Sequence, residues 1–246
     1  AWQEMARVAA EERPCFIIVA DPFSFPTRDL LDGLDYAFPG SVKVGGMASA
    51  AMQPFNNMLY LDDQVYRTGA VCVAMSGELV VDTIVAQGCR PIGGLMQVTR
   101  CDGNLLLELD NEPPVEVLRR VISTLDERDR ELARQSLLLG IVMDGLLEHP
   151  GQGDFLIRNI MGWDPNRGIM SIGELLTDGQ MVQFHLRDAE TSAEDLDGML
   201  TRYASSHRIH EEAGAILFSC LGRGSYLYGR PDHDTDMFRE KVGAMP

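Results

Sequence analysis

The stretch FLIRNIMGWDPNRGIMSIGELLTDGQMVQFHLRD, residues 155–188, indicates the class of fold. It contains three apolar runs, each of strand length, and two turn sequences, DPNRG (164–168) and TDGQ (177–180), separate them. Short strands joined by tight turns pair with one another in antiparallel sheets. The stretch therefore predicts an antiparallel meander.

A second meander is predicted upstream, between residues 58 and 109. The turn pairs Ser76–Gly77 and Asp102–Gly103 interrupt its apolar runs. The runs that we expect to be strands are MLYL (58–61), GAVCVAM (69–75), LVVDTIVAQG (79–88), GLMQVTR (94–100) and LLLEL (105–109).

Helices and further strands are predicted around the two meanders. A strand, helix, strand unit comprises CFIIVA (15–20), a helix capped by Thr27 that runs to about Phe38, and VKVGG (42–46). Pro113–Pro114 begins a helix, and a capping box of Ser192 and Asp195 begins another that ends near Ser206. The remaining predictions are helices through Glu12, over 127–135 and over 234–242, and strands LLLGIVM (137–143) and GAILFSC (214–220).

These elements predict an α/β fold of the α+β kind: mixed, largely antiparallel sheets with flanking helices. Residues 15–40 and 215–246 share an order of buried strand, loop ending in proline, acidic helix start and helix, so we expect two related halves. The first copy continues into the strand VKVGG, whereas the second stops at Pro246. We therefore expect the C-terminal half to lack its final strand.

The composition excludes several classes of partner. The chain has 37 acidic and 21 basic residues and a formal charge of −16, which repels nucleic acid phosphates and anionic membrane surfaces. Its five cysteines are an odd number without a C-x-x-C pair, as is typical of reduced thiols. No apolar run approaches the ~18 residues of a spanning helix, so we expect no membrane insertion.

Four motifs resemble the FIST domain, which occurs in bacterial signal-transduction proteins, in photosynthetic organisms and in some eukaryotic F-box proteins. They are VGGMAS (44–49), VYRTGAVCVAMSG (65–77), GDFLIRNIMGWDPNRG (153–168) with VQFHLRDAETSAEDL (182–196), and FSCLGRGSYLYGRPDHD (218–234). The resemblance implies an intracellular sensory domain, in the cytoplasm or in the plastid stroma of a photosynthetic eukaryote. It implies a small ligand such as an amino acid or a small carboxylate. The sequence shows no kinase, cyclase, methyl-accepting or F-box segment, so we expect the output partner to be a separate chain or to lie outside this one. We expect no cofactor.

The resemblance also implies two halves, over residues 1–110 and 111–246. Family members usually have a further segment before the position of residue 1 and a strand after the last helix. We therefore expect the first half to be partial at its start, and the resemblance supports the missing final strand of the second half.

A polar row is predicted on one strand of the first stretch quoted. Alternation in MVQFHLRD (181–188) puts apolar side chains on one face and Gln183, His185 and Arg187 on the other. The row is either an ordinary solvent face or a site for a carboxylate or amide ligand, because its groups offer donors of different reach. The resemblance favours a ligand site.

Two further groups of residues have a functional and a structural interpretation. Arg158 and Asn159 interrupt an apolar strand, so a structural ion pair, a ligand carboxylate or another subunit must satisfy them. Gly45, Gly46 and Ser49 follow or end a strand, where they either bring backbone N–H groups to a ligand or make a tight bend.

The glycine-rich loop after residue 220 is the last candidate. A buried strand is expected to deliver Cys220, and Gly222 and Gly224 flank Arg223, whose guanidinium is a planar fork of donors. One interpretation is that Arg223 borders one cavity with His185 and Arg187. The other is that Arg223 is buried against the acids of PDHD (231–234), where the loop would be a structural brace.

Three functions remain open: a ligand-binding sensor, a non-catalytic adaptor in a larger assembly, and a cysteine-dependent hydrolase. The hydrolase would need Cys220 as nucleophile, with His185 or His233 as base and Asp188 or Asp234 to orient it. Cys220 is flanked by Ser219 and Leu221 rather than placed at a helix N-terminus, so nothing local activates the thiol and we expect no catalysis. We also expect no metal, because no H-x-H or H-x-x-x-H spacing occurs, and no nucleotide, because GRGSYLYG (222–229) fits neither phosphate-binding glycine motif.

Overall fold

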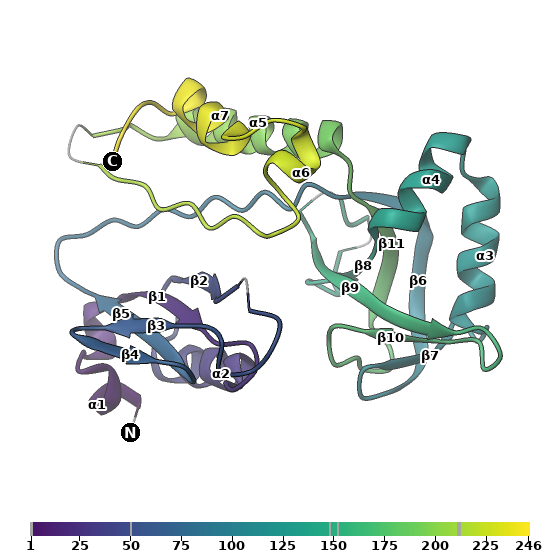
Figure 1. Ribbon diagram of the computed structural model, residues 1–246, viewed down its shortest axis with the longest axis horizontal. Coiled ribbons are helices and arrows are strands. Elements are labelled where there is room, and N and C mark those ends of the chain that lie inside the picture. Colours follow the sequence, from purple (N-terminus) through teal and green to yellow (C-terminus); the bar gives the residue numbers. More distant parts are fainter. Residues whose placement is uncertain (1, 50, 148, 152, 211–212) are drawn as a thin grey trace. The chain divides into compact units, whose positions relative to one another are not determined.

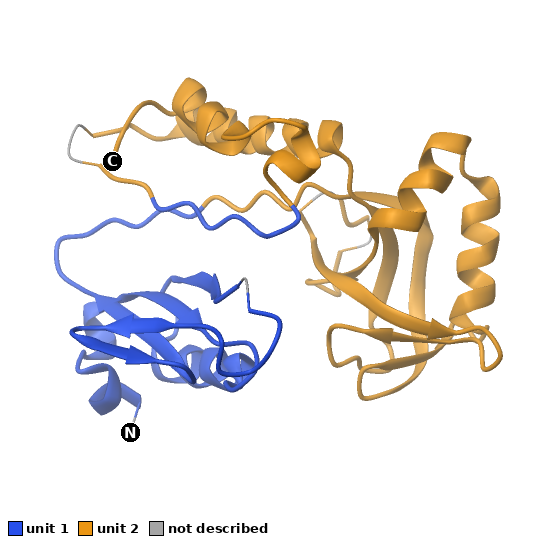
Figure 2. Ribbon diagram, in the orientation of Figure 1, with its two compact units in different colours: residues 1–83, 216–222 blue, residues 84–215, 223–246 orange. Residues whose placement is uncertain are grey.

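The computed structural model describes residues 2–49, 51–147, 149–151, 153–210 and 213–246. The chain forms two compact units, one of residues 1–83 with 216–222 and one of residues 84–215 with 223–246 (Figure 2). We call them unit 1 and unit 2. Mixed α/β structure with mostly antiparallel strand pairs is confirmed.

Unit 1 is built on the predicted strand, helix, strand unit. Strand β1 (Cys15–Ala20) lies between β2 (Lys43–Met47), which is parallel to it, and β5 (Ala70–Met75), which is antiparallel. Helix α2 (Thr27–Ala37) joins β1 to β2 and packs on one face of this sheet (Figure 1). The core between them consists of Phe16, Ile18, Leu30, Leu34 and Phe38.

Two local predictions in unit 1 are wrong. The N-terminal helix is broken into α1 (Trp2–Ala6) and a short 3-10 helix, η1 (Ala10–Glu12), because Arg7 adopts a left-handed backbone with a φ of 54°. The N-cap of α2 is Pro26, not Thr27. The Thr27 hydroxyl is buried and has no hydrogen-bond partner in the part of the chain that the structure describes.

The predicted upstream meander is not one sheet. Strand β3 (Leu59–Leu61) forms a separate hairpin with β4 (Gln64–Tyr66), and β5 belongs to the β1 sheet. Residues 79–88 form no strand, although their apolar run predicts one. Several of their apolar side chains are exposed, and within the described ranges no strand pairs with them, so this backbone does not form sheet.

Unit 2 is a closed six-stranded barrel with flanking helices. The strand order is β10-β7-β6-β11-β8-β9, and all neighbours are antiparallel. The strands are β6 (Arg90–Asp102), β7 (Leu105–Leu109), β8 (Leu137–Val142), β9 (Phe155–Asp164), β10 (Ile169–Ile172) and β11 (Met181–Leu186).

The prediction of an antiparallel meander over residues 155–188 is therefore only half correct. The DPNRG turn joins β9 and β10 as a hairpin, as predicted. Strands β10 and β11 are not neighbours, however, because β7 and β6 lie between them. The TDGQ segment instead pairs with β6, where Gly179 N–H donates to Val98 O at 2.8 Å and Val98 N–H donates to Gln180 O at 2.8 Å.

Side chains fill the barrel. The apolar faces of β6, β7, β10 and β11 converge on one cluster that includes Leu106, Met170, Val182 and Phe184, all fully buried. Helix α3 (Pro114–Thr124) begins at the predicted proline pair and packs on this cluster, and α4 (Glu127–Ser136) follows it. In a six-stranded barrel packed in this way, core side chains occupy the interior in place of a ligand.

Three helices complete unit 2: α5 (Ala189–Ser206), α6 (Ser225–Tyr228) and α7 (His233–Lys241). The N-cap of α5 is Asp188, whose carboxylate accepts from Thr191 N–H, so the predicted capping box at Ser192 is wrong. Helix α7 lies beside α5 (Figure 1), and the ion pair of Lys241 and Asp197, at 2.6 Å, joins them. Among the described residues, no helix is both long and apolar enough to cross a membrane.

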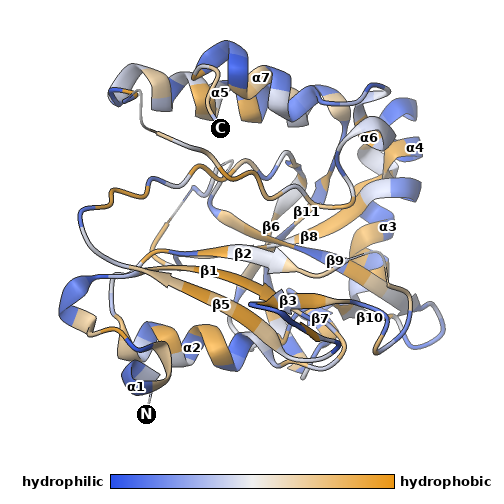
Figure 3. Ribbon diagram, turned by 60° about the vertical axis from the view of Figure 1, so that its left-hand side comes forward, coloured by the Kyte–Doolittle hydropathy of each residue, from blue (hydrophilic) through white to orange (hydrophobic). Residues whose placement is uncertain are grey.

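The strand GAILFSC (214–220) is not formed. Residues 213–220 are extended and apolar (Figure 3), but they have no regular secondary structure and Ile216, Leu217 and Phe218 are exposed. The buried strand that was to deliver Cys220 is therefore absent, and Cys220 is exposed.

Candidate functional site

An open hollow of about 780 Å³ lies at the carboxyl ends of β1 and β2 in unit 1. Because the two strands are parallel, the residues that follow them meet at the same edge of the sheet. Ligands of open α/β sheets commonly bind at such edges. The lining residues are Val19, Ala48, Ser49, Ala51, Met52, Gln53, Asn56, Asn57, Met58 and Leu59.

Asp21, the first residue after β1, anchors the loop that lines the hollow. Its fully buried carboxylate accepts from Ser24 Oγ at 2.5 Å and from Asn57 Nδ2 at 2.8 Å. The hydrogen bonds from Ser24 and Asn57 outweigh burial and hold the pKa of Asp21 below its usual value. Asn57 Nδ2 also donates to Ala48 O at 3.4 Å, so the amide oxygen of Asn57 is the group left to accept a hydrogen bond.

The lining combines neutral hydrogen-bonding groups with flexible apolar ones. Ser49 offers a hydroxyl, Gln53, Asn56 and Asn57 offer amides, and two methionines offer thioethers. None of the lining side chains carries a charge. This combination suits a small ligand with several polar atoms and no net charge.

Of the residues predicted to bind a ligand, Ser49 lines this hollow. Gly45 and Gly46 lie in β2 rather than in a bend after it. A Cβ atom on Gly45 would lie 1.8 Å from the carbonyl oxygen of Ile18, and its φ is +148°. Gly45 thus allows close approach of the chain's own β1 backbone.

Arg223 forms a buried ion pair with Asp234 in unit 2, and we call this pair the brace. Its Nε donates to Asp234 Oδ2 at 2.7 Å and its Nη2 donates to Asp234 Oδ1 at 3.1 Å. The side chains of Arg223 and Asp234 are only 8% and 10% exposed. Burial alone would raise the pKa of Asp234, but the hydrogen bonds from Arg223 and His233 lower it below its usual value. Of the two interpretations of this loop, the structure supports the brace.

Aromatic contacts extend the brace from α7 to α5. The Tyr228 and His233 rings stack with centroids 3.6 Å apart, and the Arg223 guanidinium carbon lies 5.7 Å from the Tyr228 centroid. Tyr228 OH lies 3.0 Å from the Oγ of the fully buried Ser192 on α5. Gly224 has a φ of 79° as the N-cap of α6, which explains one glycine beside Arg223 by the turn into this helix.

The predicted polar row on β11 is not a solvent face. Gln183 Nε2 donates to Gly93 O at 2.8 Å, and Arg187 Nε lies 3.4 Å from Cys89 Sγ. His185 is only 2% exposed; its Nδ1 lies 3.0 Å from Gln183 O, and its ring meets the Phe155 ring edge to face. Since a carbonyl only accepts, Nδ1 of the neutral ring carries the proton.

We expect His185 to make unit 2 less stable in acid. Burial lowers the pKa of His185, so between this pKa and the ordinary value near 6.5 the unfolded chain binds more protons. The free energy of unfolding should therefore fall below about pH 6.5, by at most about 1.4 kcal/mol per pH unit. Urea titrations followed by Trp163 fluorescence in a Trp2→Phe background will measure it.

The comparison that isolates this effect uses two histidine variants. His185→Gln should remove the acid-dependent part of the slope, whereas His207→Gln, at an exposed position, should keep it. An unchanged slope in His185→Gln would contradict the assignment.

Arg158 is satisfied within the barrel. Its Nε donates to Glu174 Oε2 at 2.8 Å and its Nη1 to Ile157 O at 3.1 Å, so a structural ion pair accounts for the arginine. Asn159 is exposed, and water can solvate it. Of the predicted alternatives for Arg158, the structural ion pair is the one that the structure shows, and Asn159 needs no buried partner because it is exposed.

The possible nucleophile of a hydrolase, Cys220, belongs to unit 1, as does Gly222. The residues that could act as its base or orient that base belong to unit 2: His185, His233, Asp188 and Asp234. Within the described residues, no group of three or more His, Cys, Asp or Glu side chains is placed to hold a metal ion.

The sequence alone did not reveal Asp21, Gln53, Asn56 and Asn57. In the sequence, Asp21–Pro22 marks only the end of the apolar run 15–20, and MQPFNNM (52–58) has no periodicity. The only available signal was a run of amide side chains in a loop soon after a glycine-ended strand.

Comparison with protein families matches the FIST N domain over residues 1–112 and the FIST C domain over residues 114–246. An uncharacterized protein of Mycobacterium tuberculosis strain H37Rv is 38% identical over 230 residues, which cover 94% of this chain and 60% of that protein. An uncharacterized protein of Mycobacterium bovis is 38% identical over 234 residues, covering 95% of this chain and 60% of that protein.

An F-box/LRR-repeat protein of Arabidopsis thaliana is 22% identical over 275 residues, covering 100% of this chain and 52% of that protein. The chain thus spans about 60% of the length of the mycobacterial relatives. No solved structure matches. With both family domains matched in order along its length, the chain belongs to the FIST family.

Proposed function

We propose that the chain is a non-catalytic sensory domain that binds a small ligand, an amino acid or a small carboxylate, in the hollow beside β1 and β2. It would signal through a separate protein partner in a reducing intracellular compartment, the cytoplasm or the plastid stroma. Membership of the FIST family supports a sensory role. The uncharged, amide-rich lining of the hollow is the observation that supports this hollow as the ligand site.

The lining favours an amino acid over a free carboxylate. No lysine or arginine lines the hollow, and residues 1–83 contain 11 acidic and five basic residues, so a bare anion would be repelled without a local counter-charge. A zwitterionic amino acid has no net charge. Its carboxylate can accept hydrogen bonds from the amides, and its ammonium group can donate to amide oxygens such as that of Asn57.

The other functions have weaker support. The F-box relative is compatible with an adaptor, which needs no occupied hollow. A hydrolase needs an activated thiol, and the extended segment that carries Cys220 offers neither a helix N-terminus nor a strand end to hold it.

Amino acids and small carboxylates will be screened for thermal stabilisation of ligand-free protein. A ligand at ~100 times its Kd adds about 2.7 kcal/mol to the stability of the folded state, which shifts the melting temperature measurably. Ser49→Leu, at an exposed lining position, should abolish the shift by filling the hollow. Thr68→Leu, an exposed position outside the lining, is the matched control.

One result would count against the sensor and another against the hollow as its site. If no compound shifts the melting temperature, the adaptor becomes the better explanation. If a compound shifts it equally in the wild type, Ser49→Leu and Thr68→Leu, a ligand binds but not in this hollow.

A further inference from the structure

We propose that the β3–β4 hairpin is a docking surface for an extended, basic segment of a partner protein, which adds a strand to β4. The surface consists of Phe55 in the preceding loop and Tyr60, Leu61, Val65 and Tyr66 in the hairpin. It adjoins the proposed ligand hollow, because Leu59 of β3 lines that hollow, but strand addition to β4 does not require a bound ligand.

Large apolar side chains are concentrated and exposed on this hairpin. Tyr60 and Val65 are directly opposite each other, and they are 66% and 53% exposed. Leu61 and Tyr66 are exposed on the other face of the hairpin. Single exposed apolar residues need no explanation, but contiguous patches with tyrosine and phenylalanine are typical of protein interfaces.

The hairpin also has an open edge. It is a two-stranded sheet, and in the described residues no further strand pairs with either side of it. Strand β3 lies towards β5, whereas all three residues of β4 are exposed. Neither strand contains lysine or proline, which natural proteins use to block such edges. A third strand would convert a marginal hairpin into a stable sheet.

The backbone holds Phe55 outward at a conformational cost. Its φ of +67° is in the left-handed region, which bulky residues rarely adopt, and the ring is 62% exposed. Arg67 Nη1, from the turn after β4, donates to Phe55 O at 3.0 Å and fixes this conformation. Strained residues persist where the surrounding structure holds them, commonly at binding sites.

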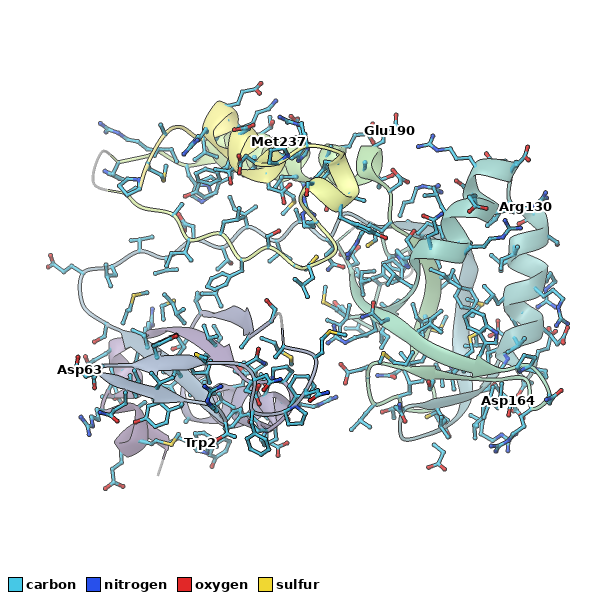
Figure 4. The ribbon with its side chains drawn as sticks, in the orientation of Figure 1. Trp2, Asp63, Arg130, Asp164, Glu190 and Met237 are labelled. Carbon is cyan, nitrogen blue, oxygen red and sulfur yellow. The ribbon has the colours of Figure 1, made fainter. Side chains whose placement is uncertain are left out.

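Charge selects the partner. Asp62 and Asp63 form the turn of the hairpin, and Asp63 lies at its outer end (Figure 4). The whole chain carries a charge of −16, so a second copy would bring like charges together. A segment that alternates apolar and basic side chains would place its apolar side chains on the face of Tyr60 and Val65, and a basic side chain at the end of the segment beside the turn would meet the two aspartates.

The probe is a fluorescein-labelled, capped peptide of eight residues that alternates valine and lysine. With the full chain it should give saturable fluorescence anisotropy and should slow hydrogen exchange of the backbone amides of residues 64–66. Val65→Lys and Asp63→Lys should each weaken binding at least about tenfold, which corresponds to about 1.4 kcal/mol. Tyr36→Lys and Asp32→Lys, at exposed positions on α2, carry the same charge changes and should not weaken it.

Three results would overturn the proposal. Equal weakening by the hairpin and helix variants would mean that the peptide binds any acidic surface. Binding without protection of residues 64–66 would exclude strand addition. A wild-type dimer in sedimentation that Val65→Lys dissociates would assign the surface to a second copy of the chain.

Discussion

Gly45→Ala should disrupt unit 1, whereas Gly46→Ala, one residue further along β2, should be tolerated. The new methyl group at position 45 would lie 1.8 Å from Ile18 O in β1, on a backbone with a φ of +148°. Relieving this clash requires β1 and β2 to separate, because a backbone carbonyl cannot rotate away. Strain and overpacking together should cost at least about 3 kcal/mol. At position 46, apart from the chain neighbours, no atom of the described residues lies within 4 Å of the added Cβ.

Urea unfolding followed by Trp2 fluorescence in a Trp163→Phe background will measure this difference. Trp2 packs against the core of unit 1, so its emission reports on this unit. Equal stability of the two variants would show that β2 can move aside. If Gly45→Ala instead kept its stability and lost the ligand-induced melting shift, Gly45 would act at the ligand site, as the sequence alone suggested.

Arg223→Ala should strongly destabilise the α5 and α7 helices of unit 2. The substitution leaves the Asp234 carboxylate buried without its bidentate partner, and breaking a buried pair in this way costs about 3 to 5 kcal/mol. Arg230→Ala is the matched control, because the Arg230–Asp236 pair on the same loop and helix is 53% and 49% exposed. It should change the stability by at most about 1 kcal/mol. Hydrogen exchange of α5 and α7 will report the local loss.

A double variant separates loss of the pair from loss of packing. Replacing a buried ion pair by apolar residues of similar volume is often neutral, so Arg223→Met with Asp234→Leu should recover much of the lost stability. The wild-type brace should also weaken in acid. Because the pKa of Asp234 lies below its usual value, its contribution is present above about pH 4 and is lost as pH falls through the folded-state pKa. Weaker ligand binding with unchanged stability in Arg223→Ala would contradict the brace.

Local patterns in the sequence were sufficient for several elements. The apolar run of β1, the helix α2 that follows it, the proline-initiated helix α3 and the DPNRG hairpin all formed where predicted. The hydrogen bonds of the two helices and the turn of the hairpin connect residues close in sequence, so local sequence is enough to predict them. Strand β1 was located by its apolar run, although its partners β2 and β5 are distant in sequence. The motifs quoted from the sequence were likewise sufficient to identify the family.

Strands and sites that depend on distant residues were not predictable in this way. The runs 79–88 and 214–220 are rich in apolar residues but, among the described residues, have no partner strand, whereas TDGQ pairs with β6, some 80 residues earlier in the chain. An apolar run indicates only that the segment can adopt an extended backbone. It becomes a β-strand when a neighbouring strand supplies its backbone hydrogen bonds.

The candidate sites show the same division. The sequence identified Arg223 and His185 as polar groups that require partners, and Ser49 as a residue after a strand. Only the tertiary structure placed Asp234 against Arg223, packed Phe155 on His185, and closed the loop of Asn57 onto Asp21 to form a hollow. A side chain's type fixes which bonds it can make, but the free energy of burying it depends on which partner the fold brings within reach, and that partner is distant in sequence.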